Sequence, residues 1–166
     1  MSKIKSDTPI VRSVAWISLI PQLLVLGLFI LLFYFLNTPN PLIFGSLAYL
    51  LVSFSLRNFL AKDHREGMKL TRMEKYDEAI PVFEKSVNFF TTYNWIDKYR
   101  YLVMLNSSKY SFKEMGLCNI AFCYSQTGNA EMTKKYYEII LEQYPNNGIA
   151  QAGLNLINSI QDDKNK

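Results

Sequence analysis

The chain has 166 residues, 49% of them hydrophobic, and a formal net charge of +4. Residues 1–12 carry +2 and residues 57–72 carry +3, which leaves −1 for residues 73–166. This distribution argues against nucleic-acid binding, because phosphate contacts need a sustained basic face on the folded domain. The only cysteines, Cys118 and Cys123, are five residues apart and point to different faces of a helix, so we expect two free thiols and no disulfide framework.

A long uncharged stretch dominates the first third of the chain. From Ser13 to Leu56 no side chain is charged, and only the polar segment 37–41 interrupts the apolar residues. Hydrocarbon offers backbone groups no hydrogen-bond partner, so a spanning segment must be helical, and about 20 residues cross the roughly 30 Å core. We therefore predict a transmembrane hairpin over residues 13–60, with spans at about 14–36 and 42–60 and a turn at 37–41.

The first predicted span contains Pro21 and Gln22 about a third of the way along. Proline removes a backbone donor and crowds the preceding turn, so we expect a kink there. Gln22 could mark a path for a solute, or it could be an ordinary polar residue in a span. The second interpretation is favoured, because no ionisable residue accompanies the amide.

Basic residues flank the hairpin on both sides, whereas its turn is uncharged. The positive-inside rule then places the basic N-terminal segment 1–12 and the C-terminal domain in the cytoplasm. We expect an integral membrane protein with both termini cytoplasmic, as in a bacterial inner membrane. The residues expected at the membrane surface are Arg12, Trp16, Arg57, Lys62 and Arg65.

Beyond the hairpin, no proline or turn cluster appears before residue 73, so we predict one helix from Leu42 to Met73, about 48 Å long. In the next helix Asp77 is the expected N-cap, which places Pro81 in the first turn.

Residues 111–161 contain several helix start and stop signals. Ser111 and Glu114 have the spacing of a capping box, Gly128 is a stop, and Asn129 can cap the following helix. Pro145 ends that helix, and Asn147 starts a last helix over 148–161, before the charged tail 162–166.

These helices resemble the tetratricopeptide repeat (TPR), a 34-residue helix pair with small and aromatic residues at fixed offsets. Residues 114–147 carry matching residues at Leu117, Ile120, Ala121, Tyr124, Gly128, Tyr137 and Pro145. Thr133 replaces the usual alanine. Residues 60–93 match at Gly67, Leu70, Tyr76, Ala79, Phe83 and Ser86, but depart at Asp63, Glu74 and Thr91. A generic bundle of helical hairpins is the alternative.

The expected fold is therefore all-α: a two-helix transmembrane hairpin, then a short α-solenoid of TPR-like helix pairs over 61–161, closed by the capping helix 148–161. The resemblance implies that the first helix of each pair lines a concave face that binds a protein or peptide. The implied contact residues are His64, Met68, Arg72, Met115, Cys118, Phe122 and Gln126.

Residues 94–113 do not fit the repeat and form an aromatic-rich insertion. Its rings could form an exposed patch that binds a partner or rests on the membrane, because exposed aromatic area usually reflects an interaction. They could equally fill the gap between two repeats, because so small a domain needs its apolar side chains for the core.

No catalytic, cofactor-binding or metal-binding pattern is present, and His64 is the only histidine. We expect a non-enzymatic, membrane-anchored interaction module, a scaffold or assembly factor, that contacts the bilayer through two spans. The alternative is a small accessory subunit of a transporter or channel that acts through its transmembrane helices, where Gly27, Gly45, Ser46 and Ala48 allow close helix packing. The oligomeric state stays open.

Overall fold

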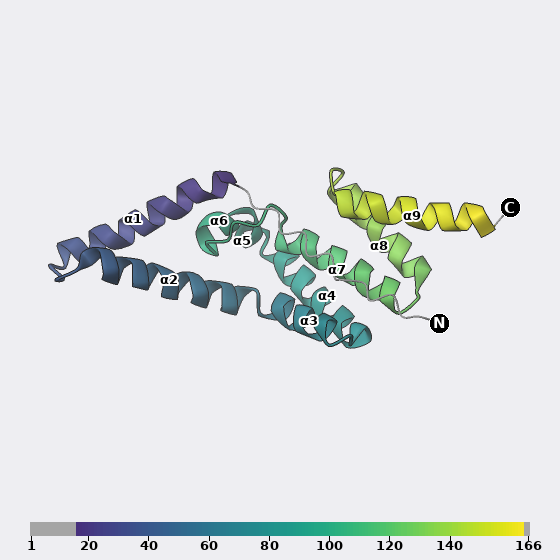
Figure 1. Cartoon of the computed structure of the whole chain (residues 1–166), viewed down its shortest axis with the longest axis horizontal. Coiled ribbons are helices and arrows are strands. Elements are labelled where there is room, and N and C mark those ends of the chain that lie inside the picture. Colours follow the sequence, from purple (N-terminus) through teal and green to yellow (C-terminus); the bar gives the residue numbers. More distant parts are fainter. Residues whose placement is uncertain (1–15, 165–166) are drawn as a thin grey trace.

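The computed structural model describes residues 16–164, and all the regular structure in that range is helical, which confirms the all-α class (Figure 1). A 3-10 turn, Trp16–Ser18, comes first. The helices are α1 (Leu19–Phe35), α2 (Pro41–Leu60), α3 (Lys62–Arg72), α4 (Tyr76–Thr92), α5 (Asn94–Lys98), α6 (Arg100–Val103), α7 (Phe112–Gln126), α8 (Ala130–Gln143) and α9 (Gly148–Lys164).

The helices α1 and α2 form an antiparallel hairpin whose closed end lies far from the rest of the molecule (Figure 1). The turn follows from its residues: Asn37 takes a left-handed backbone with φ of 51°, which asparagine tolerates, and Thr38 donates to the Phe33 carbonyl. Pro41 is then the first residue of α2, where its missing N–H costs nothing.

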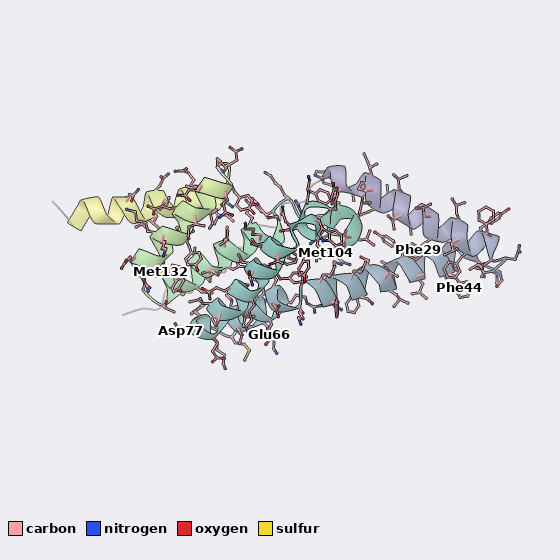
Figure 2. The ribbon with its side chains drawn as sticks, turned by 180° about the vertical axis from the view of Figure 1, so that it is seen from behind. Phe29, Phe44, Glu66, Asp77, Met104 and Met132 are labelled. Atoms are coloured by element: carbon pink, nitrogen blue, oxygen red, sulfur yellow. The ribbon has the colours of Figure 1, made fainter. Side chains whose placement is uncertain are left out.

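The two helices of the hairpin approach closely in the half next to this turn. A Cβ at Gly45 would lie 2.7 Å from the Ile30 Cα, so the missing side chain lets the two backbones approach. Phe33 stacks on Phe44 at a centroid distance of 6.3 Å. Figure 2 shows Phe44 near the closed end, whereas Met104 lies near the other end of α1.

One described helix, α2, is long and apolar enough to cross a membrane by length and composition, and α1 is apolar but has 17 residues. The structure thus contains one candidate membrane helix, and the second span stays a prediction. Pro21 is the third residue of α1 and falls in its first turn, where the missing N–H breaks no intrahelical hydrogen bond, so the reason for the predicted kink does not apply.

The predicted continuous helix from Leu42 to Met73 is wrong: α2 ends at Leu60 and α3 begins at Lys62. Ala61 has φ −104° and ψ 26°, outside helical values, and its side chain is buried with Phe90 and Met104. Neither glycine nor proline marks the break, so packing of Ala61 against residues far along the chain accounts for it.

The two helix pairs, α3 with α4 and α7 with α8, share one turn geometry at a constant offset of 54 residues. The Lys75 N–H donates to the Leu70 carbonyl at 3.0 Å, and the Asn129 N–H donates to the Tyr124 carbonyl at 3.0 Å. The residue before each donor has a left-handed backbone, Glu74 with φ 59° and Gly128 with φ 79°. Glutamate thus occupies a position that favours glycine.

The start of α4 differs from the prediction. The helix begins at Tyr76 after Lys75, so Asp77 is its second residue and not the N-cap, and Pro81 is its sixth residue. The predicted placement of Pro81 in the first turn is therefore wrong. Asp77 still lies where an acidic side chain interacts favourably with the helix dipole.

The predicted starts of α7, α8 and α9 agree with the structure. Ser111 accepts from the Glu114 N–H at 3.1 Å, and Asn129 accepts from the Met132 N–H at 3.0 Å. Asn147 accepts from the Ala150 N–H at 2.9 Å at the start of α9. This last helix runs to Lys164, three residues beyond the predicted end.

The insertion forms α5 and α6 and is anchored to α7 by a buried carboxylate. Asp97, 2% exposed, accepts from the Phe112 N–H at 2.8 Å and the Lys113 N–H at 2.9 Å. Arg100 closes the loop that follows by donating to the carbonyls of Ser108 and Lys109. Ile96, Met104 and Phe112 share one core cluster with Ala61 and Phe90.

Candidate interaction surface

The accessible side of α7 carries three of the seven residues predicted to contact a partner. Met115 and Phe122 are half-buried and Gln126 is exposed, whereas Phe112, Leu117, Ile120 and Cys123, on the other sides of the helix, are buried. The spacings of seven and four residues place these three side chains on one face. These three side chains therefore share one side of α7, and their role in binding stays a prediction.

Two contacts join this side of α7 to the first helix pair. The Asn119 amide lies 3.4 Å from the Met68 sulfur, and the ring of Phe122 packs edge-on to Tyr76 at a centroid distance of 6.0 Å. Asn119 was not among the predicted contact residues, although it lies between Met115 and Phe122 on the same face. The surface formed by Met68, Tyr76, Asn119, Phe122 and Gln126 is called the α3–α7 strip below.

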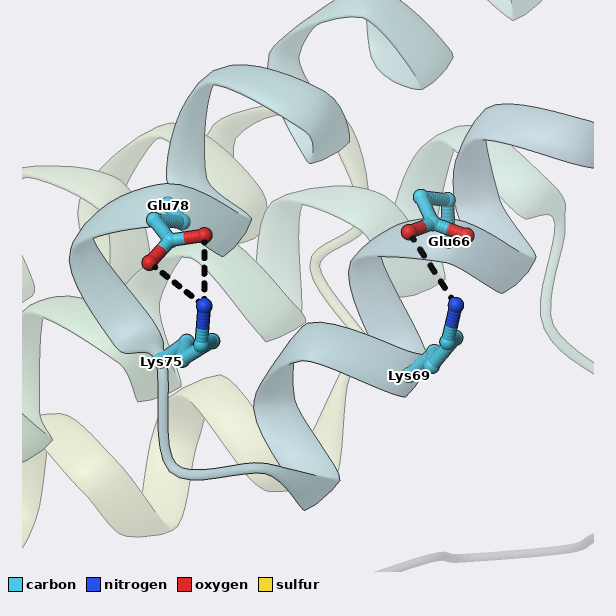
Figure 3. Close-up of polar contacts among 4 residues, drawn as sticks. All are labelled: Glu66, Lys69, Lys75 and Glu78. Carbon is cyan, nitrogen blue, oxygen red and sulfur yellow. Dashed lines mark hydrogen bonds and ion pairs between the residues drawn. The ribbon is translucent and has the colours of Figure 1, made fainter.

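Arg72 is exposed at the end of α3 and has no ion pair within residues 16–164. The nearby charges pair among themselves: Lys75 with Glu78 at 3.0 Å and Lys69 with Glu66 at 3.7 Å (Figure 3). Such exposed pairs, three residues apart on one chain segment, contribute little to stability. The guanidinium of Arg72 is thus the free cation beside the strip in the described part of the chain.

Two of the predicted contact residues are unavailable to a partner. His64 is 8% exposed, and its ring packs against Phe83 and Phe112 at 5.6 and 5.4 Å. Burial lowers the pKa of His64 to about 4, so the imidazole is neutral at physiological pH.

Cys118 lies on the flank of this face of α7 that is next to α8 and α9, and it is half-buried. The Asn147 amide lies 3.5 Å from its sulfur, and Tyr137 packs in the same cluster. Burial raises the pKa of the Cys118 thiol to about 12, so the thiol is neutral and unreactive. Cys123 is fully buried, and burial raises its pKa as well.

The residues predicted at the membrane surface are all exposed where the structure describes them. Trp16 is 78% exposed, and Lys62 and Arg65 are exposed on α3. Arg57 reaches back along α2, its Nε donating to the Ser53 carbonyl at 3.2 Å. Arg12 lies outside the described residues.

Sequence patterns did not reveal the contacts that join the insertion to its neighbours. Asp97 caps a helix that begins 15 residues later, and the side-chain amide of Gln22 donates to the Ser107 hydroxyl at 2.9 Å across 85 residues. Gln22, which was open to two interpretations, thus has a structural role as a contact with the insertion.

The described residues contain no group of three or more His, Cys, Asp or Glu side chains arranged to hold a metal. A shallow, open pocket lies beside Asp97, lined also by Asn94, Lys98, Arg100, Ser111 and Tyr144. The carboxylate oxygens of Asp97 already accept hydrogen bonds from backbone N–H groups of α7, and Ser111 caps the same helix. The pocket's polar groups therefore support the helix start.

The fold and surface define an all-α protein in which an apolar helical hairpin carries a domain of two helix pairs and a final helix. Comparison with protein-family models, curated proteins and solved structures gives no significant match.

Proposed function

We propose that this protein is a membrane-anchored interaction module whose TPR-like helix pairs are displayed to the cytoplasm. One observation carries the proposal: most of the large, exposed apolar side chains of the described chain lie on α1 and α2, whereas the remaining helices bury most of theirs in common clusters. An apolar surface of this extent needs a nonaqueous environment. The chain thus separates an anchoring part from a folded, water-facing part.

The proposed anchor consists of two spans. The 20 residues of α2 correspond to about 30 Å of helix, the thickness of a bilayer core. The 17 residues of α1, extended by the turn Trp16–Ser18, reach a similar length. Exposed Arg57, Lys62 and Arg65 follow at one end, which fits a cytoplasmic side.

The constant offset between the two helix pairs supports the likeness to TPR. Gly67 lies against the Phe83 ring, and 54 residues later Ala121 and Tyr137 share a cluster. Small residues at equivalent positions allow the two helices of each pair to pack closely. Ala79 and Thr133, also 54 residues apart, are both buried.

Binding would take place on the α3–α7 strip. Its half-buried Met68 and Phe122 offer an adaptable apolar surface, and exposed Gln126 and Arg72 offer polar contacts at its end. An amphipathic helix or extended peptide with an acidic group would suit this combination, because arginine pairs bidentately with carboxylates. The strip has no group placed for covalent chemistry, so we propose a binding role and not an enzymatic one.

Photo-crosslinking in intact membranes tests the proposal with the full-length chain. A photoreactive residue at Gln126 or Arg72 should give a discrete protein adduct, whereas the same residue at Glu138, exposed on α8, should not. Equal adducts at all three positions, or none at any, would contradict binding on the strip. Protease added to the outside of sealed vesicles should leave the domain intact if it faces the cytoplasm.

The second candidate is an accessory subunit that acts through its spans. It is favoured by Gly27 on α1, where a Cβ would have no atom within 4 Å, so another helix could approach closely. Gly45, in contrast, is already used inside the hairpin. Protein adducts from a photoreactive residue at Leu28, with none from Gln126 or Arg72, would favour this function.

A further inference from the structure

The insertion has one face built into the core and one face left open. Ile96, Met104 and Leu105 are at most 6% exposed. Trp95, Tyr99 and Leu102, spaced four and three residues apart, are 56%, 51% and 49% exposed, and Tyr93 is also exposed. The insertion thus combines both sequence interpretations: its inner side chains fill the core, and its outer side chains form a largely aromatic face along α5 and α6.

Contacts to both helices of the hairpin hold the insertion in place. α6 packs on α1, where Gln22 exchanges two hydrogen bonds with the Ser107 hydroxyl, at 2.9 and 3.3 Å. On the other side, Leu60 and Ala61 at the end of α2 belong to the core cluster of Ile96 and Met104. Figure 1 shows α5 and α6 at the open end of the hairpin.

These contacts determine the position of the insertion along the long axis of the hairpin. Gln22 is the fourth residue of α1, and Leu60 is the last residue of α2. Both lie at the end of the apolar helices where charged residues begin, at Arg57 and Lys62. The aromatic face is therefore level with the boundary between the apolar hairpin and the polar domain.

We propose that the face formed by Tyr93, Trp95, Tyr99 and Leu102 lies in the cytoplasmic headgroup layer of the same bilayer as a third membrane contact. This inference rests on the proposed membrane location of the hairpin. Tryptophan and tyrosine prefer this layer because their rings are apolar and their N–H and O–H groups reach water. Leu102 reaches toward the acyl chains.

Exposed cations of the insertion, one of them against a ring of the face, fit a lipid surface. Lys98 is exposed with its ammonium 5.7 Å from the Tyr99 ring centroid, and exposed Lys109 lies 5.9 Å from the Tyr110 ring centroid. Lysine next to interfacial aromatic residues can pair with lipid phosphates while its stem lies along the rings. The continuity of this face with the apolar hairpin favours the bilayer over a protein as its occupant.

Tryptophan fluorescence in reconstituted vesicles tests the proposal. In the full-length Trp16→Phe variant, Trp95 is the sole tryptophan. Its emission should be blue-shifted and quenched by lipids that carry a nitroxide near the headgroup, more than by lipids labelled near the chain end. Soluble iodide should quench it weakly. Circular dichroism of the variant should match that of the parent.

A second reporter separates this inference from its premise. In a Trp16→Phe, Trp95→Phe background, Leu28→Trp places the sole tryptophan in the middle of α1, where Leu28 is exposed. If nitroxide lipids quench this reporter but leave Trp95 open to iodide, the third membrane contact is overturned and the aromatic face is left for a protein partner. If nitroxide lipids quench neither reporter, the membrane anchor itself fails.

Discussion

The buried imidazole of His64 should make the protein less stable as the pH falls, and His64→Leu should remove this effect. His64 is 8% exposed between two phenyl rings, and its Nδ1 has no hydrogen-bond partner within the described residues. Burial lowers its pKa from 6.5 to about 4. Leucine is close in volume, keeps the apolar contacts and cannot bind a proton.

The direction follows from proton binding in the two states. The unfolded chain protonates His64 near pH 6.5, whereas the folded protein protonates it only near pH 4. Between these values the unfolded state holds more protons, so a lower pH favours unfolding. The stability that the protein has with a neutral His64 is therefore fully present above pH 6.5. It is lost as the pH falls to about 4. At about 1.4 kcal/mol per pH unit, the lost free energy of unfolding is about 3 kcal/mol.

Guanidinium unfolding in mild detergent, followed by circular dichroism, measures this loss at neutral pH and near pH 4. Other titrating groups are common to both proteins, so the difference between wild type and His64→Leu isolates the imidazole. Ser86→Ala is the matched control, because the Ser86 hydroxyl is also buried without a partner in residues 16–164 but does not titrate. If wild type and His64→Leu lose equal stability on acidification, the reasoning is refuted.

Three further outcomes are expected. Asp97→Ala should lower the free energy of unfolding by about 3 kcal/mol, because two backbone donors lose their charged acceptor, and Asp97→Asn should cost less, because the amide keeps one acceptor oxygen. Denaturant titration checks both, and a negligible cost of Asp97→Asn would contradict the charge-assisted cap. Glu74→Gly should stabilise by about 1 kcal/mol, because φ is 59° there; a loss of melting temperature would argue against a left-handed turn. In native protein Cys118 and Cys123 should react with a maleimide at least about 100-fold more slowly than after unfolding, and fast native labelling would contradict their burial.

The sequence predicted those parts of the fold that depend on local chemistry. Ser111, Asn129 and Asn147 each accept from a backbone N–H three residues downstream, and Gly128 provides the left-handed turn, so a short window of sequence contains the whole interaction. The turn at Asn37 is of the same kind. Helix type and most boundaries could therefore be predicted.

The features that were missed depend on contacts between distant segments. The break at Ala61 results from its burial beside Phe90 and Met104, which lie 29 and 43 residues away. Asp97 caps α7 only because the insertion folds back on it. His64 lies on the helix face predicted to be concave, yet the ring of Phe112, which precedes the matched repeat, covers it. Periodicity identifies a face of a helix, but not the side chain that covers it.

A single residue, Ala61, links α2 to α3, yet it does not act as a free hinge. Turning the domain about Ala61 would separate Ser107 from Gln22 and open the cluster that contains Ile96. A force on the helix pairs is therefore transmitted through the insertion to both α1 and α2. The angle between domain and hairpin is thus held by two points of support instead of one flexible link.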